Sequence, residues 1–527
     1  MRPISIVLAA LMVTLAAAGC QKKKVVTNAN AVHQTLTVEV FDRGKPGQPD
    51  LNNNYWTQYV NSNFGKQFNA TVTYVPVPRS QEVDKLNVLM AANQSPDIAC
   101  TYDQGTIYNY VQQGGLAQLD TPLKEYGQNL TKYLGQDVLK YGKFNGKMYS
   151  VPGKRTVLMG FNTFIRKDWL DKLGLPLPKT ADEFYNDMVA FQQKNPGNVK
   201  TVIPYGYQID NEDTAGTAYM VEAFIPPTLS AEQRATLETN PDYQANWNLP
   251  GYEDYIKYMN KMYNAGLIGK DFASDKGGKQ LDANISNGFV GAYSSNWDSP
   301  YRTAPGDYTN LKKNVPGAEL VPIDPWQNSA GKYPEETYSP NGMYIIIPKT
   351  SKVVNLAIQY LNWMSESKNT LYLQNGQEGV DYNMVNGVPV QTGTTTSGNK
   401  MMTVANNLDY DLLSNGIEIG DPQKDIVAVS AGYPGFQNDV NQSAKTSMID
   451  PYQPYYYSIP NASHAKDSQA LIDLSVIMIS KLLVCPPAQV DSLYKTLVSQ
   501  FMAQGGQANY NEYVKNYKAQ NATSSSK

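Results

Sequence analysis

The chain has 527 residues, with 44 basic and 47 acidic side chains and a formal net charge of -3. This length exceeds the size at which a single hydrophobic core stops growing, so we expect two or more lobes. Because the charges nearly balance and no basic stripe runs along the chain, nucleic acid is excluded as an expected partner.

The first 19 residues have the pattern of a secretory leader. The uncharged run Ile4–Ala18 follows Arg2 and, at about fifteen residues, is shorter than the ~20 that a membrane-spanning helix needs. It ends in Ala17-Ala18-Gly19-Cys20, which resembles the bacterial lipobox, although Leu usually stands where this chain has Ala17. We therefore expect a signal peptide over residues 1–19 and lipid on Cys20, which would tie the mature protein to the membrane. The alternative is an ordinary secreted protein in which Cys20 has no such role.

The residues after the leader predict a tether and then a protein without further membrane segments. Residues 20–34 are polar and lack periodicity, as a linker does. No later apolar run is long enough to cross a bilayer. Besides Cys20, the chain has only Cys100 and Cys485, which are too few for a disulfide framework. These two cysteines either pair or remain as buried thiols.

The first part of the mature chain predicts alternating strands and helices. The segment 35–41, TLTVEVF, alternates as a strand does, and 70–77 and 97–100 are the next two predicted strands. Between the first two, the segment 55–68 has apolar residues at intervals of four, which indicates a helix: Trp56, Val60, Phe64 and Phe68. This order predicts right-handed crossovers and a largely parallel sheet.

Two helices with a tight connection are predicted in Asn162–Phe191, NTFIRKDWLDKLGLPLPKTADEFYNDMVAF. Gly174 is placed to end the first helix, because glycine readily adopts the left-handed conformation found there. Prolines follow in the connection. Thr180 and Glu183 have the spacing of a capping box, which predicts the start of the second helix.

The segment Asn162–Phe191 also closely resembles family 1 of the extracellular solute-binding proteins of bacterial ABC importers, especially the larger lipoproteins associated with complex sugars. Other segments resemble the same family in the expected order, and together they cover most of residues 35–385: KLNVLMAANQSPDI (85–98), GLAQLDTPLKEY (115–126), NGKMYSVP (145–152), NGFVGAYSSNW (287–297), YIIIPKTSKVVNLAIQYLNW (344–363) and GQEGVDY (376–382).

The resemblance implies an α/β protein with the two-lobed periplasmic-binding-protein-like (type II) fold, in which hinge strands flank a central ligand cleft. We expect lobe I to contain residues 35–153 and about 319–375, and lobe II to contain 154–318 and about 376–527. The implied protein is a monomer on the outer side of the cell membrane. It would capture an oligosaccharide and deliver it to the permease subunits of an ABC transporter.

Candidate ligand contacts come from two arguments. Loops at the carboxyl ends of strands face the crevice in sheets of this kind, which nominates Asp42 and Arg43 after the first strand and Tyr102 and Asp103 after the third. The resemblance adds residues of the second lobe and of the first crossing between lobes: Trp297, Asp298, Tyr205, Tyr207 and Arg155. For each of them the structural alternative is a buried tyrosine bonded to backbone or a rim charge in water.

Tyrosine is unusually frequent, with 38 residues. Its apolar face and polar tip suit sugars, which present C–H faces and hydroxyl groups, although a secreted surface can be rich in tyrosine for other reasons. The run PYQPYYY at 451–457 either extends the binding site or forms a packed aromatic loop.

Catalysis is the alternative function, as a secreted glycosidase or lyase, and another surface glycan-binding lipoprotein is a third. A glycosidase needs two carboxyl groups beside the scissile bond, and two pairs are candidates: Glu378 with Asp381, and Glu335 with Glu336. Motifs for a serine hydrolase, a zinc protease or a phosphate-binding loop are missing from the sequence. With only two histidines, we expect no catalytic residues, cofactor or metal centre.

Overall fold

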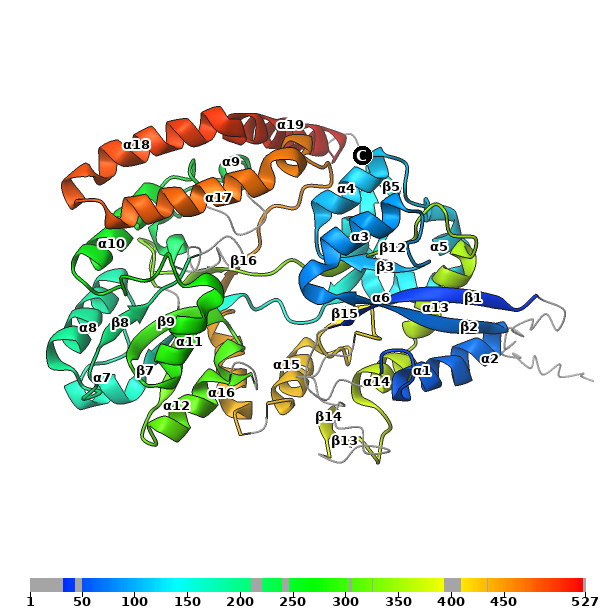
Figure 1. Ribbon diagram of the computed structural model, residues 1–527, viewed down its shortest axis with the longest axis horizontal. Coiled ribbons are helices and arrows are strands. Elements are labelled where there is room, and N and C mark those ends of the chain that lie inside the picture. Colours follow the sequence, from blue (N-terminus) through cyan, green and yellow to red (C-terminus); the bar gives the residue numbers. More distant parts are fainter. Residues whose placement is uncertain are drawn as a thin grey trace, which may run out of the picture.

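Two mixed sheets, each covered by helices, form two lobes that lie side by side (Figure 1). The computed structural model describes residues 32–42, 50–209, 220–238, 246–302, 306–324, 326–392, 409–433 and 435–524. The predicted leader, its Cys20 and residues up to 31 therefore lie outside the described residues, as does Arg43. The two-lobed α/β architecture predicted from the sequence is confirmed.

The lobe I sheet has the strand order β15-β6-β12-β3, with bounds Ser414–Asn415, Ser150–Arg155, Asn341–Ile346 and Ala99–Thr101. Beside it, β1 (Gln34–Asp42) and β2 (Ala70–Pro78) pair in parallel. The N–H of Glu39 donates to the carbonyl of Ile98 at 2.8 Å, and the N–H of Ile98 donates to Thr37 at 3.0 Å. These bonds join β1 to the segment that enters β3, so the three strands predicted first are adjacent.

The expectation of a largely parallel sheet is correct only for this first part of the chain. Strand β12 is antiparallel to both β3 and β6. The reason is topological, because the chain leaves lobe I through β6 and returns from lobe II through β12 in the opposite direction. A short hairpin, β4–β5 (Lys143–Phe144, Lys147–Met148), completes this region, whereas the hairpin β13–β14 (Tyr382–Val385, Val388–Gln391) packs against α15 (Pro422–Ala431).

Helices of lobe I bury apolar stripes against its sheet. The predicted helix 55–68 is continuous through α1 (Tyr55–Val60), a π-turn and α2 (Lys66–Phe68), with Trp56, Val60 and Phe64 buried in the lobe I core. The others are α3 (Glu82–Ala91), α4 (Gln104–Gln112), α5 (Asp120–Tyr126), α6 (Gln128–Leu139), α13 (Val354–Met364) and α14 (Ser367–Asn375).

The lobe II sheet has the order β10-β7-β9-β8, with bounds Leu320–Ile323, Phe161–Arg166, Val290–Asn296 and Ile203–Gly206. The two helices predicted after β7 are present. The first ends at Gly174 in the left-handed conformation, and the second begins with the capping box of Thr180 and Glu183. The helices are α7 (Lys167–Leu173), α8 (Ala181–Lys194), α9 (Ala231–Leu237), α10 (Tyr252–Asn264), α11 (Lys279–Ser286), α12 (Asp307–Asn314), α15 (Pro422–Ala431) and α16 (Gln437–Thr446).

Strand pairing moves two of the expected lobe boundaries. Residues from about 319 were assigned to lobe I, but β10 pairs with β7 and forms the edge of the lobe II sheet. The second crossing between lobes therefore follows β11 (Pro334–Glu336) rather than preceding β10. Residues 409–415 were assigned to lobe II, but Leu412 and Leu413 lie in the lobe I core and β15 pairs with β6.

The chain ends in three long helices: α17 (Ala462–Val484), α18 (Val490–Phe501) and α19 (Gln507–Ser524). Helix α17 contacts α10 of lobe II and α4 of lobe I, so a single helix touches both lobes (Figure 1). The strand before it, β16 (Asp450–Tyr452), pairs in parallel with β11.

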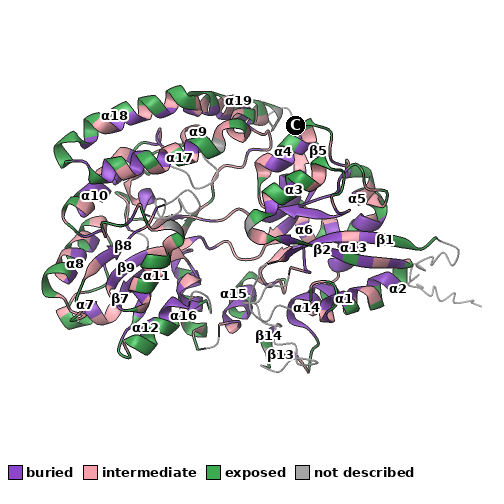
Figure 2. Cartoon of the chain, in the orientation of Figure 1, coloured by how far each residue is buried: buried purple, intermediate pink, exposed green. Residues whose placement is uncertain are grey.

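Burial follows the layers, with buried strands inside and exposed outward faces on helices such as α12 and α18 (Figure 2). Cys100 and Cys485 are both buried and free, and they belong to the cores of different lobes. Within the described ranges, every helix is either too short or too polar to cross a membrane.

Candidate functional site

A cleft with a volume of about 270 Å³ lies where lobe I meets the second crossing segment and the C-terminal segment. Three parts of the chain that are far apart in sequence line it. Lobe I contributes the end of β3, the first turns of α4 and the end of β6. The other two parts are the residues from Glu336 to Tyr344 and those from Pro454 to His464, with Tyr513 of α19 beside them.

Half-buried tyrosines dominate the lining of the cleft: Tyr102, Tyr108, Tyr338, Tyr455 and Tyr456. The ring of Tyr456 packs on that of Tyr141, with centroids 4.0 Å apart, and its hydroxyl donates to the carbonyl of Lys140 at 3.1 Å. The cleft thus combines fixed aromatic faces with polar edges, a combination that suits a ligand with both C–H faces and hydroxyl groups.

Ionisable side chains are few in this cleft. Asp103 caps the N-terminus of α4, where its carboxylate accepts the backbone N–H of Thr106. The Arg155 guanidinium lies 4.4 Å from the centre of the Tyr338 ring. Glu336 is on the opposite side of the crossing segment from its neighbour Glu335, because successive residues of a strand point to opposite faces.

Three of the residues predicted as ligand contacts are brought together in the cleft: Tyr102, Asp103 and Arg155. Tyr102 and Asp103 follow β3, as the argument from the carboxyl ends of strands predicts, and Arg155, which the resemblance nominated, ends β6. Asp42 ends β1 and is half-buried, but it does not line this cleft. Arg43 belongs to the segment 43–49, outside the described residues.

Trp297 and Asp298, by contrast, are used in the packing of lobe II. The Trp297 side chain is only 5% exposed and lies in a core cluster with residues of α15 and α16. Asp298 is buried, forms a two-pronged ion pair with Arg302 at 2.6 and 2.9 Å, and accepts the hydroxyl of Tyr433. Both residues follow β9 as expected, but helices α15 and α16 cover that place, so neither lines the cleft.

Tyr205 and Tyr207 are core residues as well. Tyr205 packs edge-on against Phe184 of α8, and its hydroxyl bonds to that of Ser294 at 2.9 Å. Both tyrosines lie in the main core of lobe II and neither lines the cleft. Burial raises the pKa of each far above the ordinary tyrosine value, so both remain neutral donors inside the lobe.

Sequence reasoning missed Tyr338 and left the run 451–457 undecided. Tyr338 lies in the second crossing segment, whose position could not be inferred while β10 was placed in the wrong lobe. The run is divided by the structure, because Tyr452 pairs within β16 while Tyr455, Tyr456 and Tyr457 line the cleft. The high local density of tyrosine was the available signal.

A known protein family shares a large part of this sequence. The model of the bacterial extracellular solute-binding protein family matches residues 49–371. The chain belongs to this family. The resemblance noted in the sequence is thereby confirmed.

Relatives of this solute-binding protein include Lipoprotein LipO of Bacillus subtilis, 27% identical over 72% of this chain and 73% of LipO. The polygalacturonan/rhamnogalacturonan-binding protein YtcQ of the same organism is 28% identical over 44% of this chain and 45% of YtcQ. Among solved structures, the Streptococcus pneumoniae substrate-binding protein FusA in complex with kestose has a TM-score of 0.63. It is 14% identical and covers 93% of this chain and 100% of FusA, which supports a shared fold.

The crossing segments of the solute-binding protein approach each other closely. The N–H of Arg155 donates to Pro340 at 2.8 Å and that of Tyr338 donates to Leu158 at 2.9 Å. A Cβ atom on Gly160 would lie 2.6 Å from the carbonyl oxygen of Glu336, so this approach requires glycine. We therefore expect the first two crossing segments, residues 155–160 and 336–341, to move together as a hydrogen-bonded pair.

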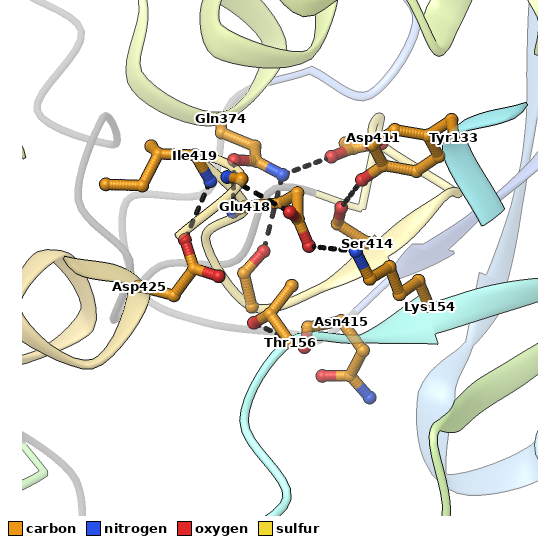
Figure 3. Close-up of polar contacts among 12 residues, drawn as sticks. Tyr133, Lys154, Thr156, Gln374, Asp411, Ser414, Asn415, Glu418, Ile419 and Asp425 are labelled. Atoms are coloured by element: carbon orange, nitrogen blue, oxygen red, sulfur yellow. Dashed lines mark hydrogen bonds and ion pairs between the residues drawn. The ribbon is translucent and has the colours of Figure 1, made fainter. Parts of the chain in front are cut away.

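A third crossing, residues 415–422, runs from β15 to α15 and is held by polar contacts (Figure 3). Lys154 of β6 pairs with Glu418 at 2.8 Å. The side chain of Gln374 donates to Asp411 at 2.6 Å and accepts the N–H of Glu418 at 3.1 Å. Burial raises the pKa of Asp411 to about 7. All three crossings are thus fixed to the sheet of lobe I.

Proposed function

We propose that this protein is the membrane-anchored substrate-binding component of an ABC importer, which captures an extracellular oligosaccharide between its lobes and delivers it to the permease. One observation carries the proposal: a tyrosine-lined cleft sits directly on the segments that connect the lobes. A ligand bound there contacts lobe I, the second crossing segment and the C-terminal segment. Such a ligand favours the closed arrangement, which a permease can then distinguish from the open one.

The chemistry of the cleft supports a carbohydrate. Tyrosine rings supply flat surfaces for the C–H faces of sugar rings, and the side chains of Asp103, Asn341 and Asn461 add polar groups near them. Two similar proteins point the same way, since one is named as binding polygalacturonan and rhamnogalacturonan and another was solved with kestose.

The anchoring part of the proposal rests on the N-terminal sequence. A lipidated Cys20 followed by the polar residues 21–34 would place the lobes on the outer side of the cell membrane, near a permease. The relative LipO is named as a lipoprotein, which supports the same arrangement.

Neither carboxylate pair considered for catalysis has the arrangement of a glycosidase pair. Asp381 is fully buried and accepts the N–H of Gln377 at 2.8 Å, whereas Glu378 is exposed. Glu335 is buried and accepts the N–H of Phe161 at 3.2 Å, while Glu336 faces the cleft. Two carboxyl groups flanking one glycosidic bond are therefore not supplied by either pair.

The test is a binding screen of the chain lacking its leader and lipid. Oligosaccharides of defined length are added in a thermal-shift assay, because a ligand specific for the folded state raises its stability by mass action. Calorimetry then gives the stoichiometry, and release of reducing ends reports turnover. We expect one ligand per chain without turnover. Catalytic release of sugar, or no stabilisation by any carbohydrate, would contradict the proposal.

One variant and a matched control test whether the ligand binds in the cleft. Tyr338→Ala removes a lining ring, and we expect it to weaken binding roughly tenfold or more, since an aromatic contact of this size is worth more than 1.4 kcal/mol. Tyr185→Ala is the matched control, because Tyr185 is a half-buried tyrosine on α8 that does not line the cleft. Equal losses of affinity in the two variants would argue against this site.

A further inference from the structure

We propose that Arg155 binds a carboxylate of the ligand, so that the oligosaccharide captured by this protein contains uronic acid residues. This inference rests on the proposed function and adds to it the chemical class of the sugar.

Arg155 differs from the other arginines of the described chain in its partners. Four described arginines each have a carboxylate within ion-pair distance: Arg79 with Glu82, Arg166 with Asp168, Arg234 with Glu222 and Glu238, and Arg302 with Asp298. Among the residues that the structure describes, no carboxylate forms an ion pair with Arg155. Among the described arginines, Arg155, which lines the cleft, is thus the one whose charge is available to pair with an anionic group of a ligand.

The position of Arg155 is fixed without an ion pair. Its backbone N–H donates to Pro340, and its Cα is paired with Asn415 in the register of β6 and β15. Its guanidinium stacks on the ring of Tyr338, whose hydroxyl accepts a hydrogen bond from the side chain of Asn296 at 2.7 Å. Asn296 belongs to β9 of lobe II. The arginine is therefore held at the meeting point of both lobes before any ligand arrives.

The hydrogen-bonding capacity of this guanidinium is incompletely used. The Nε atom of Arg155 is buried and has no hydrogen-bond partner within the described structure. A buried N–H without a partner is destabilising, and an acceptor brought by a ligand would remove that cost. Carboxylate is the acceptor that matches a guanidinium best, because its two oxygens meet two parallel N–H groups.

The acidic groups of the cleft do not compensate the charge of Arg155. The Asp103 carboxylate bonds to the N-terminus of α4, where the helix dipole already favours it. Burial, followed by the charges of Glu238 and Glu222, raises the pKa of Glu336 well above its ordinary value, which favours the neutral form. His464 is the other basic side chain of the lining. An anionic sugar therefore meets little repulsion beside Arg155.

The test compares acidic sugars with their neutral counterparts. Trisaccharides of galacturonate, glucuronate and mannuronate are each measured by calorimetry beside the same trisaccharide with its carboxyl groups reduced to alcohols. We expect the wild-type protein to bind at least one acid roughly 10- to 100-fold more tightly than its reduced form, the range for a charge-assisted pair. Arg155→Gln should remove most of that preference. Arg155→Lys, which keeps the positive charge but lacks the two parallel N–H donors of the guanidinium, should retain part of it.

Lys332→Gln makes the same change of charge at an exposed residue outside the cleft and should leave the preference intact. Equal affinity for acid and reduced forms, or a preference that survives in Arg155→Gln, would overturn this inference while leaving the proposed function in place. Failure of every saccharide, neutral or acidic, to bind would overturn both. If Arg155→Gln does not fold, the comparison of acid with reduced sugar in the wild-type protein still decides.

Discussion

Replacing Trp297 with alanine distinguishes a core residue from a ligand platform. The indole is 5% exposed and belongs to the lobe II cluster that also contains Phe164, Tyr293 and residues of α15 and α16. Truncating a buried tryptophan typically costs about 3–5 kcal/mol, because the lost contacts leave a cavity. For a lobe of this size, each kcal/mol lowers the melting temperature by about 2–4 °C. We therefore expect Trp297→Ala to lower it by roughly 6–20 °C.

Differential scanning calorimetry of the ligand-free variant measures this loss, and titration calorimetry at a temperature where it is still folded measures its affinity for the sugar. The packing role predicts an early melting transition with the dissociation constant nearly unchanged. A melting temperature close to that of the wild type, together with a much larger dissociation constant, would refute the reasoning and place the indole in the ligand site. Trp297→Phe, which keeps an aromatic ring in the core, should lose less stability than Trp297→Ala.

Three further predictions concern the anchor, the motion and the buried charge. Cys20→Ala should leave an uncleaved precursor or release the protein from the membrane, as judged by mature size, lipid labelling and fractionation; unchanged behaviour would end the lipoprotein proposal. Small-angle scattering should show a smaller radius of gyration when the cognate sugar is added, and no change at saturation would count against hinge closure. Burial raises the pKa of Glu39 from 4.5 to about 8, so between these pH values the folded protein keeps a proton that the unfolded chain has released, and stability falls as the pH rises. Glu39→Gln should therefore gain more in melting temperature at pH 8 than at pH 5, and equal gains at both would contradict this linkage.

Local patterns predicted the elements of this fold well because each has a local cause. The alternation in β1, the stripe through Trp56, Val60 and Phe64, and the capping box at Thr180 all arise from contacts within a few residues or on one face. The position of β10 has no local cause. The sequence of these four residues is compatible with the edge of either sheet, and only the pairing of β10 with β7 assigns the strand to lobe II.

The candidate site could be predicted only in part for a similar reason. The rule that strands end at the crevice nominated Tyr102 and Asp103, the resemblance nominated Arg155, and all three line the cleft. The resemblance also nominated Tyr205 and Trp297, but α8, α15 and α16 pack over them. A sequence shows which aromatic residues follow a strand, but the helix that covers them comes from elsewhere in the chain.

Helix α17 has a consequence for how ligands reach the cleft. Its 23 residues span about 35 Å, with one part against α4 and another against α10. Because a helix resists stretching, the two lobes are joined at a second place, apart from the three crossing segments (Figure 1). Two separated attachments define an axis, so the lobes can swing about the line between them but cannot part along it. We therefore expect access to the cleft to depend on rotation of the lobes about this line rather than on their separation.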